Sequence, residues 1–318
     1  MARSPVSSTA TAGDRVVSRS VAANLLRSVR PHQWTKNLII FAGLIFGLAD
    51  QQHPNIDTRV AVERAITAFA VFCALSGVVY LINDVRDRDA DRLHPAKSRR
   101  PIASGALSPN VALTAAVTIA VTAVASAFLV NHSFGLVATL YVLLLAFYST
   151  SIKHVVILDV LTIAAGFVLR AVGGAVAVEV QFSNWLLLLT LLLALFLALS
   201  KRRAELVTLA DEAKGHRRIL AEYSPYLLDQ MISVVTASTL LAYAFYTIDP
   251  ATVQKFGTDK LLWTVPFPLY GIFRYLYLVH QRDGGGNPSE TLLTDRPILG
   301  CVALWGLAVV LILYGPWR

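Results

Sequence analysis

The stretch "WLLLLTLLLALFLALS", residues 185–200, decides the fold class. Its residues are nearly all apolar, and they lack the alternation of apolar and polar positions that a strand of a membrane barrel shows. A segment in lipid must satisfy its backbone hydrogen bonds internally, so only α-helices and closed barrels cross a bilayer. The stretch therefore predicts a membrane helix, and with it an all-α, polytopic membrane protein.

The same pattern recurs along most of the chain. The 318 residues are 55% hydrophobic and only 15% charged, which is a membrane composition. A hydrocarbon core of about 30 Å needs roughly 20 apolar residues per helix, and about nine blocks approach that length. The predicted spans lie near residues 37–49, 64–82, 111–130, 134–148, 155–178, 184–199, 231–247, 261–280 and 297–314.

The distribution of Lys and Arg predicts how the chain crosses the membrane. These residues crowd the connections at 83–110 and 200–230, whereas the short links at 131–133 and 179–184 contain none. Because basic loops stay in the cytoplasm, we expect both basic connections and the N-terminus on the cytoplasmic side of the cell (inner) membrane. The net charge of +8 follows from this bias, so no nucleic-acid partner is expected.

The chain start differs from the rest in composition. Residues 1–25 are rich in Ser, Thr and Ala with scattered Arg, and they lack a long apolar core. We expect these residues to form a disordered cytoplasmic tail, and residues 26–318 to form one transmembrane domain.

An acidic segment, "NDVRDRDAD", follows the second predicted span. Asn83, Asp87 and Asp91 are spaced four residues apart, so they share one face of a helix that continues out of the membrane. Asp84 lies beside that face, and Tyr80 lies one turn earlier. Such oxygens suit Mg²⁺, which takes one or two carboxylates and completes its shell with water and substrate phosphates. The segment therefore predicts a magnesium site that holds a diphosphate.

A plainer interpretation of this segment is a solvated helix end, in which Asp and Arg residues pair at a spacing of four. That interpretation explains the arginines well. It does not explain an acidic run on the cytoplasmic side, where the topology rule asks only for positive charge.

The acidic segment also carries a family resemblance. "NDVRDRDAD" fits the pattern Asn-Asp-x-x-Asp-x-x-x-Asp and resembles the motif of the UbiA superfamily of intramembrane prenyltransferases. Its place after the second span and the number of spans agree with that family. The resemblance covers the chain from about Arg30 to the last span. It implies a UbiA-like bundle of about nine transmembrane helices with an active-site cavity open to the cytoplasm.

The chain departs from that family after the sixth span. Members that use prenyl diphosphates usually carry a second aspartate-rich motif there, whereas this chain has "SKRRAEL" at 200–206. Cations at this place bind a phosphate directly. Together with "RPHQWTKN" (30–37) and "HPAKSRRPIASG" (94–105), this resembles the polyprenyl-phosphate (decaprenyl-phosphate) phosphoribosyltransferase branch. The resemblance implies Mg²⁺-dependent transfer of 5-phosphoribose from 5-phosphoribosyl 1-diphosphate (PRPP) to a polyprenyl phosphate, a step that feeds decaprenylphosphoryl arabinose and cell-wall arabinan synthesis.

The resemblance also implies roles for individual residues. Asn83, Asp84, Asp87 and Asp91 would bind Mg²⁺, and the three aspartates would be the catalytic residues. The phosphates of the donor and of the lipid would share a set of cations, and the sequence leaves their division open. For the lysines, anchoring of helix ends at the membrane surface is the alternative. The expected substrate-binding residues are Lys36, Tyr80, Lys97, Arg100, Lys153, Arg170, Lys201 and Arg202.

Two charged residues lie inside the fifth predicted span. A charge in a transmembrane helix costs about 2.5–3.5 kcal/mol on insertion scales, so Asp159 and Arg170 are functional candidates. They lie about 16 Å apart along a helix, too far for a direct pair. We expect Arg170 to bind a phosphate and Asp159 to form a hydrogen bond with a neighbouring helix.

Other functions stay open at this point. A prenyltransferase that moves an isoprenoid from its diphosphate to an aromatic or other small acceptor shares the fold and the acidic motif. A transporter is disfavoured, because its path needs polar groups near the midplane and beyond, whereas most charges here crowd one membrane face. The expected partners are PRPP, a polyprenyl phosphate and membrane lipids, and the sequence leaves the oligomeric state open, a homo-oligomer included.

Overall fold

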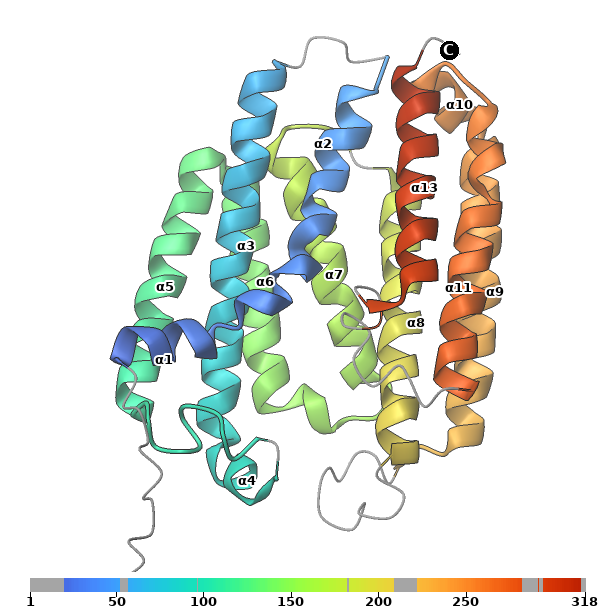
Figure 1. Ribbon diagram of the computed structural model, residues 1–318. Helices are drawn as coiled ribbons and strands as arrows, with labels where there is room; N and C mark the ends of the chain where they lie inside the picture. The colour runs from blue at the N-terminus through green and yellow to red at the C-terminus, as the bar shows by residue number, and fades with distance from the viewer. Residues whose placement is uncertain are drawn as a thin grey trace, which may run out of the picture.

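The computed structural model describes residues 20–51, 57–95, 97–181, 183–208, 222–281, 291 and 294–315. Within those ranges the chain forms helices and no strand, and the helices pack side by side in one bundle (Figure 1). Seven of these helices are long and apolar enough to cross a membrane. The predicted all-α, multi-pass membrane architecture is therefore confirmed, while the count of nine spans and the cytoplasmic orientation stay predictions.

The seven candidate spans are α3 (Thr58–Arg86), α5 (Pro109–Val130), α6 (His132–Thr150), α7 (Leu158–Ala177), α8 (Asn184–Thr208), α9 (Pro225–Ile248) and α13 (Arg296–Tyr314). The shorter elements are α1 (Val21–Ser28), η1 (Pro31–Ile40), α2 (Phe41–Leu48), α4 (Arg88–Leu93), η2 (Ile152–His154), α10 (Pro250–Phe256), η4 (Lys260–Thr264) and α11 (Pro266–Gln281).

Two predicted spans are divided into shorter helices. The first, at residues 37–49, consists of the end of the 3₁₀ helix η1 followed by α2, and Lys36 lies just before it. The eighth consists of η4 and α11, and Pro266 opens α11 because its missing N–H suits a first helical turn. The sixth span behaves differently, since α8 continues to Thr208 and carries the basic residues 201–203 on the helix itself.

The boundary predicted for the N-terminal tail is wrong. Residues 1–19 lie outside the described residues, but α1 begins at Val21, where Ser20 Oγ accepts a hydrogen bond from the Ala23 N–H at 3.3 Å. Leu25 packs against a core cluster that contains Leu81 of α3. This tertiary contact orders α1, and Figure 1 shows the helix lying across the bundle rather than along it.

Small residues let η1 and α2 cross α7 closely. A Cβ on Gly43 would lie 2.7 Å from the Cα of Ala175, and a Cβ on Gly174 would overlap the carbonyl oxygen of Ile40. Close backbone approach at small residues is a common way for membrane helices to associate. The crossing fixes η1, which carries Lys36 and Asn37, against the helix that carries Arg170.

This crossing generates a prediction for stability. Gly174→Ala should lower the free energy of unfolding by at least roughly 1–3 kcal/mol, because the new methyl group meets backbone that cannot move aside. Gly306→Ala is the matched control, since nothing lies within 4 Å of a Cβ there. Thermal unfolding in detergent measures both variants. An unchanged midpoint for Gly174→Ala would contradict the close crossing.

Candidate active site

The acidic segment lies where α3 leaves the bundle. α3 ends at Arg86, and Asp87 links it to the short helix α4. The N–H of Asp87 bonds the carbonyl of Asn83 at 2.9 Å, and the N–H of Asp91 bonds the carbonyl of Asp87 at 2.8 Å. The helical path therefore continues through a break at Asp87, whereas a single continuous helix was expected.

Two arginines hold two of the aspartates. One Arg100 nitrogen, Nη1, donates to Asp84 Oδ1 at 3.1 Å and to Asp91 Oδ2 at 2.6 Å. Arg30 Nη2 donates to the same Asp84 oxygen at 2.6 Å, and its guanidinium lies 4.8 Å from the centre of the Tyr80 ring. Both carboxylates are buried. Asp84 and Asp91 therefore converge on one cationic nitrogen.

This convergence fits a magnesium ion. The described residues contain no cluster of three or more His, Cys, Asp or Glu side chains placed for a metal. Mg²⁺ needs only one or two carboxylates, however, and takes its other ligands from water and phosphate. The nitrogen of Arg100 lies where Asp84 and Asp91 can share a cation, so the donor set suits the predicted ion.

The third aspartate contacts a different element. Asp87 Oδ1 accepts a hydrogen bond from Lys153 Nζ at 2.7 Å. Lys153 lies in η2, the link between α6 and α7, so a residue distant in sequence meets the acidic segment, and its expected role in phosphate binding stays a prediction. Asn83 is half-buried, and the carbonyl of Lys97 accepts a bond from the N–H of Arg100 at 2.9 Å. The predicted residues of this segment are thus brought together at one end of the bundle.

Arg170 is buried, and its hydrogen-bond partners are neutral groups. Its Nε donates to Asn37 Oδ1 at 2.7 Å, and its Nη2 donates to the Tyr141 hydroxyl at 2.6 Å. The guanidinium also lies over the rings of Tyr141 and Phe167. Within the described part of the chain, no carboxylate pairs with it. A buried charge without a counterion is costly, and the expected phosphate ligand of Arg170 would offset that cost.

Lys36 and Lys201 complete a group that we call the inner cation cluster, defined as Lys36, Arg170 and Lys201. Lys36 lies in η1, outside the seven candidate spans, and burial lowers its pKa to about 8. The charges of Lys201, Arg170 and Arg30 act on that pKa in the same direction as burial. Lys201 also approaches Glu205 at 3.8 Å. Three elements thus bring cations to one place.

Arg202 is engaged with carboxylates. Its Nε donates to Asp159 Oδ2 at 2.8 Å, and its Nη1 donates to Glu205 Oε2 at 2.8 Å. The hydroxyl of Tyr223 donates to the other Asp159 oxygen at 2.8 Å. Asp159 therefore bonds a neighbouring helix, as predicted. Arg202 was predicted to bind substrate. In the structure its hydrogen bonds connect α8 to α7 through Asp159.

Arg30, Asn37, Tyr141 and Tyr223 belong to these networks and were not predicted. Arg30 and Asn37 begin and end the segment "RPHQWTKN", whose pattern offered a signal for them. Tyr141 lies in an apolar run, and Tyr223 lies within the connection at 200–230. Neither tyrosine carries a local signal, because each gains its partner only when distant helices pack.

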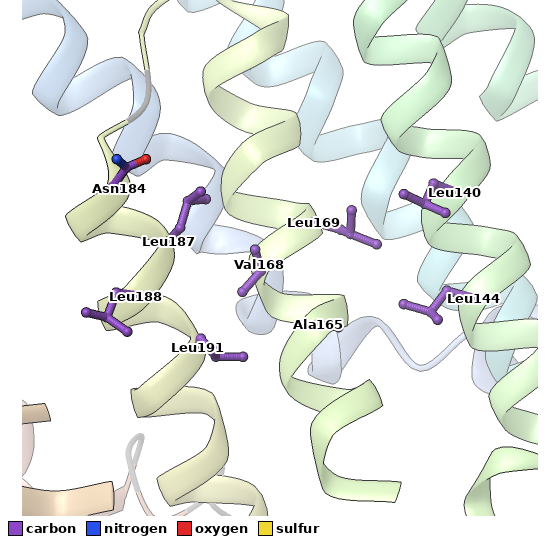
Figure 2. Close-up of a pocket in the computed structure, with 9 residues that line it drawn as sticks. All are labelled: Leu140, Leu144, Ala165, Val168, Leu169, Asn184, Leu187, Leu188 and Leu191. Atoms are coloured by element: carbon purple, nitrogen blue, oxygen red, sulfur yellow. The ribbon is translucent and has the colours of Figure 1, made fainter. Parts of the chain in front are cut away.

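Two separate hollows lie among the described residues near the elements discussed above. One, of about 250 Å³, lies beside Asp84 between the end of α1 and the turn at residues 99–101. The other, of about 600 Å³, lies between α6, α7 and α8 and is lined by leucines, Ala165, Val168 and Asn184 (Figure 2). The larger hollow has no ionisable side chain in its lining. The candidate site therefore lies at the end of the bundle that holds the aspartates.

The chain is similar to known proteins over most of its length. The family model of the UbiA prenyltransferase family matches residues 38–291. A decaprenyl-phosphate phosphoribosyltransferase of Corynebacterium glutamicum is 32% identical over 302 residues, which cover 93% of this chain and 88% of that protein. The protein of the same name from Mycobacterium tuberculosis is 30% identical over 293 residues, which cover 92% of this chain and 94% of that protein.

A solved structure supports the fold. A UbiA homolog from Archaeoglobus fulgidus bound to GPP and Mg²⁺ superposes with a TM-score of 0.68 at 18% identity. The match covers 91% of this chain and 99% of the other. At this identity the likeness shows a shared fold and no more.

The lowered pKa of Lys36 predicts a pH dependence. Below about pH 8 the ammonium is charged and attracts an anion, and above that pH the charge is lost. The affinity for inorganic phosphate should therefore fall about tenfold from pH 7 to pH 9 relative to the Lys36→Arg variant, whose guanidinium stays charged. The affinities of both proteins are measured by isothermal titration calorimetry. The ionisation of phosphate itself affects both proteins equally, so it cancels in the comparison. Parallel pH profiles would exclude Lys36 from the anion site.

Proposed function

The chain belongs to the UbiA prenyltransferase family, and from this membership and the site geometry we propose that it is a polyprenyl-phosphate phosphoribosyltransferase. It transfers 5-phosphoribose from PRPP to a polyprenyl phosphate such as decaprenyl phosphate and releases diphosphate. The names of the curated relatives support this assignment, and so does the alignment over nearly the whole chain. The product would feed decaprenylphosphoryl arabinose and cell-wall arabinan synthesis.

The observation that carries the proposal is the inner cation cluster. Arg170 is buried with only neutral partners in the described part of the chain, and Lys36 and Lys201 lie near it. An acceptor that bears a phosphate neutralises these charges on binding. A neutral aromatic acceptor would leave the charge of Arg170 unmatched among the described residues, which favours the lipid phosphate over the acceptors of a prenyltransferase.

The aspartates and their cations would bind the leaving group. Asp84, Asp87 and Asp91 would hold Mg²⁺, which when bound neutralises charge on the departing diphosphate. Arg30, Arg100 and Lys153 already contact these carboxylates. The same cations would donate to the diphosphate oxygens.

The bond changes are those of a displacement at the anomeric carbon. An oxygen of the lipid phosphate forms the new bond to C1 of the ribose, while the bond from C1 to the diphosphate oxygen breaks and its electrons leave with diphosphate. A phosphate monoester is largely ionised at neutral pH, so no protein group needs to remove a proton. The inner cation cluster contributes by holding the nucleophile in line with C1.

The substrate assignment predicts the outcome of a direct assay. Purified protein given labelled PRPP and a polyprenyl phosphate should move the label into the lipid only when Mg²⁺ is present. A parallel reaction with a prenyl diphosphate and small aromatic acceptors should give no product. Product from the second reaction alone would replace the proposal with the prenyltransferase alternative.

The metal role of Asp87 predicts a second outcome. Asp87→Asn should lower turnover at least about a hundredfold, because the side chain loses the charge that binds the cation. Asp89→Asn is the matched control, since the Asp89 side chain is 92% exposed and pairs only with Arg92 at 3.5 Å among the described residues. Both variants should stay in the membrane fraction. Full activity of Asp87→Asn would remove the assigned role.

A further inference from the structure

The smaller hollow is a second place where cations gather. We call it the outer basic pocket, and it is distinct from the inner cation cluster in the residues that form it. It has a volume of about 250 Å³, and Ser28 and Pro101 complete its wall. Its ionisable lining consists of Arg27, Arg30, His32, Asp84, Arg99 and Arg100.

The charges in this pocket are only partly matched. Arg30 and Arg100 pair with the buried carboxylates of Asp84 and Asp91. Arg27 and Arg99 form no hydrogen bond or ion pair with any residue that the structure describes, and both are exposed. The pocket therefore holds two guanidinium groups in excess. A phosphate monoester carries about two negative charges at neutral pH, which matches that excess.

We propose that the outer basic pocket binds the 5-phosphate of PRPP, which is the phosphate monoester of a small sugar phosphate. This inference rests on the proposed function and divides its cations between the two substrates. The outer basic pocket takes the 5-phosphate, the aspartates take the diphosphate, and the inner cation cluster is left for the lipid phosphate.

The position of Asp84 supports the donor as the ligand. Asp84 lies in the wall of the pocket and also belongs to the segment assigned to the diphosphate. PRPP carries phosphoryl groups at both ends of one ribose, so it needs two adjoining anion sites of this kind. Arg30 and Arg100 line the pocket and contact Asp84, and they join the two sites.

The backbone of Arg30 indicates that the turn between α1 and η1 is fixed by its surroundings. Arg30 has φ 54° and ψ 67°, a left-handed conformation that is strained for a residue with a side chain. Such strain persists where neighbouring contacts determine the backbone, and it is concentrated at ligand sites. The adjacent Val29 packs on α3 so closely that a Cβ on Gly77 would lie 2.9 Å from it. This turn keeps Arg27 and Arg30 in one pocket.

A binding experiment without acceptor lipid tests the pocket directly. Ribose 5-phosphate is titrated calorimetrically into the full-length protein in detergent. Arg27→Gln and Arg99→Gln should each weaken binding about tenfold, since each removes one charge-assisted hydrogen bond. Arg86→Gln is the matched control, because Arg86 is exposed at the end of α3 and does not line the pocket. Arg27→Lys, which keeps the charge, should retain most of the affinity. Unchanged affinity in both Gln variants would overturn the proposal.

Steady-state kinetics separate this inference from the proposed function. Both Gln variants should raise the KM for PRPP about tenfold while kcat and the KM for polyprenyl phosphate stay constant. A raised KM for the lipid alone would assign the pocket to a lipid headgroup and overturn the proposal. If wild-type protein binds ribose 5-phosphate through Arg27 and Arg99 but moves no label from PRPP, the pocket stands and the proposed function fails.

Discussion

A charge buried in a membrane bundle must be matched inside the protein, and this constraint organises the charged end of the structure. Asp84 and Asp91 are matched by Arg30 and Arg100, and Asp159 is matched by Arg202. Arg170 breaks the rule, since only neutral groups bond it within the described residues. Leaving a buried charge unpaired is costly, and proteins tolerate that cost mainly where a ligand supplies the counterion.

The matched pairs also position the elements around the site. Arg30 lies 54 residues from Asp84, and Lys153 lies 66 residues from Asp87. These pairs tie the α1–η1 turn and the α6–α7 link to the end of α3. Gly43 and Gly174 have the same effect by packing, because they bring η1 and α2 against α7. The cations that serve the two proposed substrates therefore come from elements that are distant along the chain and are held on a common frame.

The sequence predicts these parts of the structure unequally. Long apolar blocks predict the helices, because twenty apolar residues in lipid have few alternatives to a helix. The acidic segment predicts its own helix only in part, since the break at Asp87 depends on partners that distant elements supply. Residues 21–25, the first part of α1, were assigned to the tail because the sequence does not reveal the packing against α3 that orders this short helix. The sequence does not predict the roles of Asn37 and Tyr141 for the same reason, because only the fold brings them to Arg170.

The ion pairs of the free protein resemble the charge arrangement that a bound donor would create. Arg100 now gives Asp84 and Asp91 a shared cation. On the proposed function, Asp84 and Asp91 would hold the metal ion in place of that guanidinium, and Arg100 would then be free to donate to diphosphate oxygens. Each of these charges would keep a partner of opposite sign, so the desolvation cost of exposing a bare ion in the bundle would be avoided. Among the described residues Arg170 has no such internal partner, and an anionic acceptor would match its charge. The aspartates have internal partners of opposite charge, and Arg170 has none in the part of the chain that the structure describes. This difference favours a site that holds its donor by exchanging ion pairs and selects its acceptor by charge.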